Sequence, residues 1–232
     1  IPQPNSTPSS RPTLTQHSAR DLYNLGFNVF PQPFGKKAGL PWKQLQYTRL
    51  HPDDLNSLFA GQCNLAVMCG RTSGNLLVID CESILALNSH IGHLRQHGIP
   101  LWIVQTARGG HIYLRCADGE VANIESGLLP DAEIRGARGY VLAPGSVHPT
   151  GALYQWYARE GAAPPTVHAA DIDWLKDSSG RPIKLKLTHR KKHSFTPYNP
   201  LSRATQDYLS SGHTLPEGSR NNRLFSAACD LL

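Results

Sequence analysis

Two carboxylates at the end of an apolar segment are the side chains best suited to chemistry. In Leu76–Glu82, four consecutive apolar residues precede Asp80, and Glu82 follows two positions later. Such a run predicts a strand that is buried on both faces. On an extended strand the two carboxylates share one face, about 6.6 Å apart, and their burial requires positive charge between them. Oxygen ligands favour Mg²⁺ or Mn²⁺, but a strand end that runs into solvent would also explain the pair.

Two further segments place polar side chains on one face of a strand. Residues 109–115 alternate polar and apolar side chains, with His111 on the polar side, and Ala132–Arg135 does the same for Glu133. If these strands share a sheet with the acidic strand, one face carries three carboxylates, a histidine and arginines. This composition is unusual for a core, although a half-buried antiparallel sheet also has one solvated face.

A series of short motifs extends over most of the chain in a specific order. They lie at Leu25–Pro31, Pro41–Lys43, Asn64–Gly70, Leu76–Glu82, Thr106–Tyr113, Glu133–Gly136 and Tyr140–Gly151. The series resembles the bifunctional DNA primase/polymerase (prim-pol) domain of the archaeo-eukaryotic primase superfamily. The resemblance implies an α+β protein: a primase-polymerase fold with a mostly antiparallel, RRM-like sheet flanked by helices, plus a short C-terminal helical appendage.

The resemblance also implies roles for particular residues. The family's first acidic motif falls on Asp80 and Glu82, and its third acidic position falls on Glu133. These carboxylates would be catalytic and would bind Mg²⁺ or Mn²⁺. Asp131 has the same strand parity as Glu133 and is an alternative to it. The family's histidine motif falls on His111, which would contact the triphosphate of the incoming nucleotide.

Nucleotidyl transfer also needs groups that bind a triphosphate. Two metal ions about 3.5–4 Å apart can stabilise the attacking and leaving oxygens, and cationic or donor side chains bind the phosphates. The candidates besides the histidine are Arg135, Arg138, Ser146 and His148. Ser146 and His148 share parity in an extended segment, but a turn serine and a surface histidine would explain them equally well.

Positive charge is concentrated near the C-terminus. Residues 1–175 hold 13 Lys/Arg and 13 Asp/Glu, whereas residues 176–223 hold 10 Lys/Arg and three acids. A basic segment attracts nucleic-acid backbone without sequence preference, although a solvated linker would have a similar composition. The candidate nucleic-acid-binding residues are Lys184, Lys186, Arg190, Lys191 and Lys192.

Composition and the positions of turn-forming residues divide the chain into four parts. We expect a disordered segment at 1–15, a catalytic domain at 16–178, a basic linker at 179–200 and the start of a truncated helical domain at 201–232. Helices are predicted at His17–Gly26, Ser83–His97, Ile172–Lys176 and Leu201–Ser210; strands are predicted at Asn64–Cys69, Leu101–Gln105, His111–Arg115, Ala132–Arg135, Tyr140–Ala143 and Ala152–Trp156.

Several classes of protein are disfavoured. No apolar run is long enough to span a membrane. The five cysteines are scattered without a Cys-x-x-Cys pair, which argues against a zinc site of the usual spacing and for a reducing compartment. The resemblance implies a cytoplasmic replication protein of a prokaryote, plasmid, phage or mobile element.

The resulting hypothesis is a template-directed nucleotidyltransferase. It would synthesise primers or extend DNA from dNTPs or NTPs on a single-stranded DNA template, and a helicase or helical domain would be a partner in a longer protein. The alternatives are a catalytically silent nucleic-acid-binding replication module and a metal-dependent nuclease, since paired carboxylates also serve hydrolysis.

Overall fold

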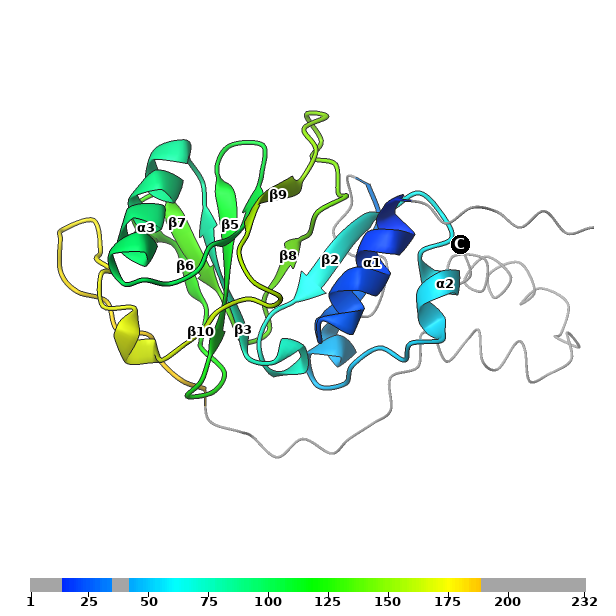
Figure 1. Ribbon diagram of the computed structural model, residues 1–232, viewed down its shortest axis with the longest axis horizontal. Coiled ribbons are helices and arrows are strands. Elements are labelled where there is room, and N and C mark those ends of the chain that lie inside the picture. The colour runs from blue at the N-terminus through cyan, green and yellow to red at the C-terminus, as the bar shows by residue number, and fades with distance from the viewer. Residues whose placement is uncertain (1–13, 35–41, 189–232) are drawn as a thin grey trace, which may run out of the picture.

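A computed structural model describes residues 14–34 and 42–188 as two mostly antiparallel sheets with few helices (Figure 1). The larger sheet has the order β6-β7-β3-β5-β4-β9, and β10 pairs with β5 in parallel. Its strands are β3 (Leu76–Cys81), β4 (Trp102–Gln105), β5 (Gly110–Cys116), β6 (Ile124–Leu129), β7 (Ala132–Arg135), β9 (Gln155–Arg159) and β10 (Thr166–Val167). This arrangement confirms the α+β class.

The smaller sheet has the order β1-β2-β8 and lies between the larger sheet and α1 (Figure 1). Its strands are β1 (Asn28–Gln32), β2 (Asn64–Met68) and β8 (Tyr140–Leu142). The helices are α1 (Leu14–Asn24), α2 (Asp54–Leu58) and α3 (Ile84–Gln96), with short 3₁₀ turns at Trp42–Gln46, Arg71–Ser73 and Ala169–Asp171. In the part of the chain that the structure describes, no helix has the length and apolar character needed to cross a membrane.

Strand β3 is buried on both faces, as its apolar run predicts. Leu76 and Val78 belong to the first core, which combines residues of both sheets and α1. Leu77 and Ile79 belong to the second core, which lies between the larger sheet and α3. The even-numbered side chains of β3 therefore face the smaller sheet, and this alternation decides where Asp80 lies.

Most predicted elements are present with shifted ends. The helix after the acidic strand begins where expected, because the Ser83 hydroxyl accepts a hydrogen bond from the Ala86 amide at 3.2 Å. The strand predicted at Ala152–Trp156 is found at Gln155–Arg159. Strands β1, β6 and β10 and helix α2 were not predicted, and the helix predicted at Leu201–Ser210 lies outside the described residues.

The predicted closing helix at Ile172–Lys176 is wrong. The chain forms a 3₁₀ turn at Ala169–Asp171 and then runs without helix to Lys176, which bridges to Pro182. Ile172, Trp174 and Leu175 are buried in the second core. Tertiary contacts with α3 take the place of local helical hydrogen bonds. The Trp174 indole packs on the ring of His93 in α3 and on the ring of His97 at the C-terminal end of that helix.

Residues 179–188, which composition assigned to a linker, pack on the domain. Leu185 lies in the second core, and Leu187 forms a bridge with Val121. The Thr188 amide donates a hydrogen bond to the Glu120 carbonyl at 2.8 Å. The folded part described here therefore continues to Thr188.

The contact between Trp174 and α3 predicts a loss of stability in acid. The Trp174 indole N–H donates to His90 Nδ1 at 3.2 Å, and burial, together with the charge of His93, lowers the pKa of His90 from 6.5 to about 4. Between these values the unfolded chain binds a proton that the folded chain does not, so the free energy of unfolding should fall as pH falls through this window. Denaturant titrations from pH 7 to pH 4 measure it.

The matched variant is His90→Gln, which cannot titrate. It should show a smaller decrease in the free energy of unfolding over the same pH range. An identical decrease in both proteins would contradict the assignment to His90.

Candidate functional site

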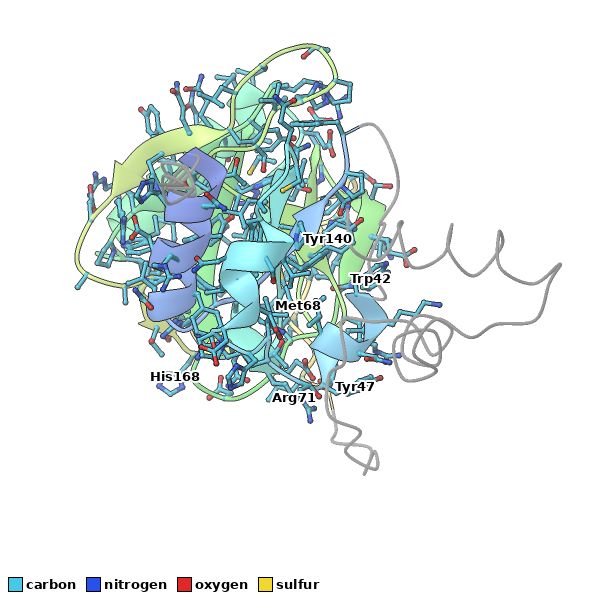
Figure 2. The ribbon with its side chains drawn as sticks, turned by 90° about the vertical axis from the view of Figure 1, so that its right-hand side faces the viewer. Trp42, Tyr47, Met68, Arg71, Tyr140 and His168 are labelled. Carbon is cyan, nitrogen blue, oxygen red and sulfur yellow. The ribbon has the colours of Figure 1, made fainter. Side chains whose placement is uncertain are left out.

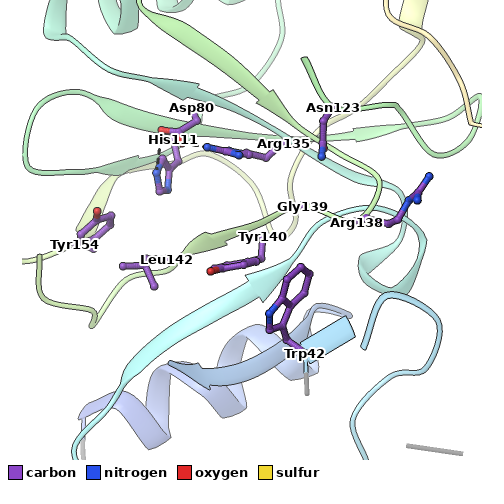
Figure 3. A pocket seen from close by; sticks show the side chains of 10 residues that line it. All are labelled: Trp42, Asp80, His111, Asn123, Arg135, Arg138, Gly139, Tyr140, Leu142 and Tyr154. Atoms are coloured by element: carbon purple, nitrogen blue, oxygen red, sulfur yellow. Dashed lines mark ion pairs between the residues drawn. The ribbon is translucent and has the colours of Figure 1, made fainter. Parts of the chain in front are cut away.

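Three strands align a row of polar side chains on the face of the larger sheet that looks toward the smaller one. Asp80 on β3 is directly opposite Glu133 on β7 and His111 on β5. His111 Nε2 lies 3.2 Å from Asp80 Oδ1. Arg135, two residues beyond Glu133, pairs with the Glu133 carboxylate. The Arg135 Nε lies 3.7 Å from Asp80 Oδ2 (Figure 3). The predicted convergence of these four residues is therefore observed.

Asp80 is held in its ionised form despite partial burial. Burial raises the pKa of the Asp80 carboxyl, but the hydrogen bond with His111 and the charges of His111 and Arg135 outweigh it and leave the pKa below its usual value. His111 and Glu133 are only 5% and 8% exposed. The row therefore presents acceptor oxygens that are shielded from water, and a cation is the partner that such oxygens favour.

His111 has one ring nitrogen left for a ligand. Its Nε2 faces Asp80, whereas its Nδ1 is buried and has no hydrogen-bond partner among the described residues. A buried polar atom without a partner is uncommon and points to a missing ligand or water. The ring lies 5.7 Å from that of Tyr154.

A pocket of about 390 Å³ opens between the two sheets. Asp80, His111 and Arg135 form its charged wall on the larger sheet (Figure 3). Tyr140 of β8 and Trp42 form an aromatic wall opposite, with ring centroids 5.3 Å apart (Figure 2). The remaining lining residues are Asn123, Arg138, Gly139, Leu142 and Tyr154. The pocket can hold a molecule that has one anionic and one planar part.

The aromatic wall was not predicted from the sequence. A signal was available, since Tyr140 and Leu142 alternate with the buried Val141 and therefore share a face of their strand. Trp42 belongs to a motif of the resemblance, but nothing local links it to residue 140. Only the packing of the 3₁₀ turn on β8 reveals that pairing.

None of the carboxylates of Glu82, Asp131 and Glu133 is part of the pocket lining, but Glu133 is directly opposite Asp80. Glu82 follows the end of β3 and pairs with the exposed Arg108. Its amide donates to the Asp131 carbonyl at 2.7 Å. Asp131 is exposed in a turn with φ of +47° and accepts from the Ser83 hydroxyl at 3.2 Å. The residue that the structure brings beside Asp80 is thus Glu133.

The other predicted ligand residues also lie outside the pocket lining. The Ser146 hydroxyl is buried, donates to the Leu65 carbonyl and accepts from the Leu65 amide, both at 2.9 Å. His148 is half-buried, with its Nδ1 2.9 Å from the Thr150 hydroxyl. The basic residues Lys184 and Lys186 line pockets elsewhere on the domain; Arg190, Lys191 and Lys192 lie outside the described residues.

The carboxylates fit a metal that is shared with a ligand rather than enclosed by protein. No group of three His, Cys, Asp or Glu side chains within residues 14–34 and 42–188 is placed to hold a metal ion. Asp80 and Glu133 nevertheless offer paired oxygens in a shielded site. Mg²⁺ is commonly bound by one or two carboxylates, with water and substrate phosphates completing its shell.

The fold and site define an α+β domain with a pocket suited to an anionic, planar ligand. Residues 19–183 match the family model described as bifunctional DNA primase/polymerase, N-terminal (Prim-Pol). The chain therefore belongs to the Prim-Pol family, and the resemblance noted from its motifs is confirmed. A comparison with curated proteins gave no match.

Arg138 yields a prediction that separates stability from ligand binding. It is an exposed lining residue with φ of +66°, a conformation that strains any residue with a Cβ by about 1–2 kcal/mol. No hydrogen bond or ion pair links it to another described residue, so its charge is available to an anion. Arg138→Gly should raise the free energy of unfolding by up to about 1 kcal/mol and weaken binding of inorganic tripolyphosphate.

Thermal denaturation and calorimetry measure the two effects. Arg138→Lys is the control, because it retains both the charge and the strain and should resemble the unmodified protein in both measurements. Unchanged tripolyphosphate affinity in the glycine variant would contradict a role for this cation in the pocket.

Proposed function

We propose that the domain is a template-directed nucleotidyltransferase. It adds nucleotides from dNTPs or NTPs to a growing strand on a single-stranded DNA template. The observation that supports it most is the aligned row Glu133–Asp80–His111 in a chain of the Prim-Pol family. Asp80 and His111 of this row line the pocket that also holds the aromatic wall. Such a pocket matches the two ends of a nucleoside triphosphate, namely a polyanion and a planar base.

The charged wall would bind the triphosphate. When its ring carries a proton on both nitrogens, His111 can donate from its free Nδ1 to a phosphate oxygen. The guanidinium of Arg138, which has no partner among the described residues, is a second donor. Arg135 now neutralises Asp80 and Glu133. If a divalent cation took over that neutralisation, Arg135 would become a further phosphate ligand.

Asp80 and Glu133 would hold Mg²⁺ or Mn²⁺, together with oxygens of the nucleotide. Such ions stabilise the attacking and leaving oxygens of an in-line displacement at phosphorus. Glu82, predicted as a third ligand, would first have to leave Arg108. That exposed ion pair is of a kind worth only about 0–1 kcal/mol, so the exchange has a small energetic cost.

The aromatic wall would position the base. Tyr140 and Trp42 meet at a tilted angle of 60°, and an aromatic side chain can stack on any base because every base has a π face. This explains how one pocket could accept four nucleotides while template pairing selects among them.

Substitutions in the row test the function. They also decide whether Glu133 or Asp131 is the third catalytic carboxylate. Asp80→Asn and Glu133→Gln keep the side-chain shapes but remove the charges, and each should lower nucleotide incorporation about 100-fold or more. Asp131→Asn is the matched control and should retain incorporation, because Asp131 lies in an exposed turn. Labelled nucleotides on a single-stranded template with Mg²⁺ or Mn²⁺ provide the assay.

Full incorporation by Asp80→Asn would refute the proposed function. Loss of incorporation in Asp131→Asn with normal activity in Glu133→Gln would reverse the assignment of the third carboxylate. Release of shortened template by the unmodified protein, without incorporation, would favour a nuclease.

The basic C-terminal segment is tested by truncation after Thr188. An earlier end would remove Leu185 from the second core, which would confuse binding with stability. If Arg190, Lys191 and Lys192 contact template, the truncated protein should bind single-stranded DNA more weakly, and each lost phosphate contact should flatten the slope of log affinity against log salt by about 0.7. Equal affinity and slope would instead make the segment a spacer to a helicase or helical domain.

A further inference from the structure

Strand β9 forms an edge of the larger sheet and carries an exposed aromatic and a cation. The sheet ends at β9, which pairs with β4. Tyr157 on β9 is 62% exposed, and Arg159 is exposed as well. An open edge with these side chains is available to a partner.

The row of site residues continues to this edge. Asp80 is opposite His111, His111 is opposite Val104, and Val104 is opposite Trp156. Trp156 therefore stands two strands from His111 on the same face of the sheet, and its ring packs 5.3 Å from that of Trp102. Tyr154, which lines the pocket, precedes β9 by one residue.

A β-bulge directs Arg159 to this face. Ile103 pairs with Ala158 and Val104 pairs with Trp156, so Tyr157 is an extra residue in the ladder. Regular alternation would place Trp156 and Ala158 on one face, yet Trp156 packs on the first core and Ala158 on the second. The bulge thus reverses the alternation, and bulges commonly re-aim side chains beside active sites.

Arg159 is a cation without an anionic partner. Opposite Trp102 in the ladder, it holds its guanidinium carbon 4.9 Å from the Trp102 ring centroid and 5.3 Å from that of Trp156. Its chain neighbour Glu160 is bound by Arg95 and by the Leu101 amide instead. No carboxylate in the described part of the chain pairs with Arg159.

We propose that Trp156, Tyr157 and Arg159, here called the β9 strip, bind the single-stranded nucleic acid whose end enters the pocket. Stacking on Tyr157 and contact of Arg159 with a phosphate are the two interactions that sequence-tolerant binding of single strands uses. The unpaired positive charge and the continuity with the pocket favour this partner over a protein. The proposal rests on the proposed function only for the statement that the end of the bound strand points into the pocket. Binding of the strand to the strip does not require a nucleotide in the pocket.

Equilibrium binding of a fluorescent single-stranded oligonucleotide of mixed sequence to the full chain tests the strip. Tyr157→Ala and Arg159→Gln should each weaken binding about five- to tenfold. Arg159→Gln should also flatten the salt slope by about 0.7. The controls are Leu128→Ala, at the exposed opposite edge on β6, and Arg20→Gln, exposed on α1; both should bind as the unmodified protein does.

The outcomes separate the strip from the proposed function. Unchanged affinity in both strip variants would overturn the strip and leave the nucleotidyltransferase proposal standing. Weaker affinity in the strip variants, combined with full incorporation by Asp80→Asn, would support the strip and refute the proposed function. If Arg159→Gln unfolds, Tyr157→Ala decides alone, because no hydrogen bond, ion pair or ring contact joins the Tyr157 side chain to another described residue.

A cross-linking experiment identifies the partner's position directly. An oligonucleotide that carries a photoreactive base at an internal position, outside the end that enters the pocket, should cross-link to the peptide that contains residues 155–159. Cross-links confined to residues beyond 188 would assign single-strand binding to the basic segment and overturn the strip.

Discussion

The antiparallel pairing of β3 with β5 on one side and β7 on the other is the constraint on which the site depends. It places Asp80 between His111 and Glu133 in a single row. A slip of one residue in either pairing would move every side chain of the slipped strand to the opposite face. Leu77 and Ile79, with their cross-strand neighbours in the second core, oppose such a slip because it would move the charged side chains of the row into that core. Hydrophobic burial on one face thus fixes the chemistry on the other.

The ion pairs of this row contribute little to the free energy of unfolding. Desolvation offsets much of the attraction in a partly buried ion pair, and apolar residues of similar volume often stabilise a protein as well or better. Arg135 prevents two adjacent carboxylates from being left uncompensated, but an apolar trio would need no such compensation. The proposed function accounts for the row, because Asp80 and Glu133 would bind a cation and the arginines would bind an anion. Glu82 and Arg108 form the same type of pair at the surface, where it exchanges easily.

The pocket lies between the two sheets, and polar contacts hold the segments of its aromatic wall on the smaller sheet. The buried Asn28 side chain donates to the Leu45 and Thr48 carbonyls and accepts from the Leu50 amide, which ties the segment after Trp42 to β1. Ser146 ties the segment after β8 to β2 through both polar groups of Leu65. These contacts place Trp42 and Tyr140 opposite the charged row. On the other side of the row, the bulge in β9 brings Arg159 onto the same face, so one surface extends from the carboxylates to the edge of the sheet.

The sequence by itself determined the local features of this protein. A continuous apolar run identified β3, and alternation of polar and apolar residues identified β5 and β7 and the faces on which His111, Glu133 and Arg135 lie. The order of the motifs identified the family. The tertiary structure alone decided which strands are neighbours, that Ser146 is a packing residue outside the pocket lining, that Trp42 meets Tyr140, and that residues 172–176 form no helix. The reason is physical: periodicity reports the faces of one element, whereas pairing, bulges and inter-sheet contacts depend on residues that are distant in the chain and meet only when the cores form.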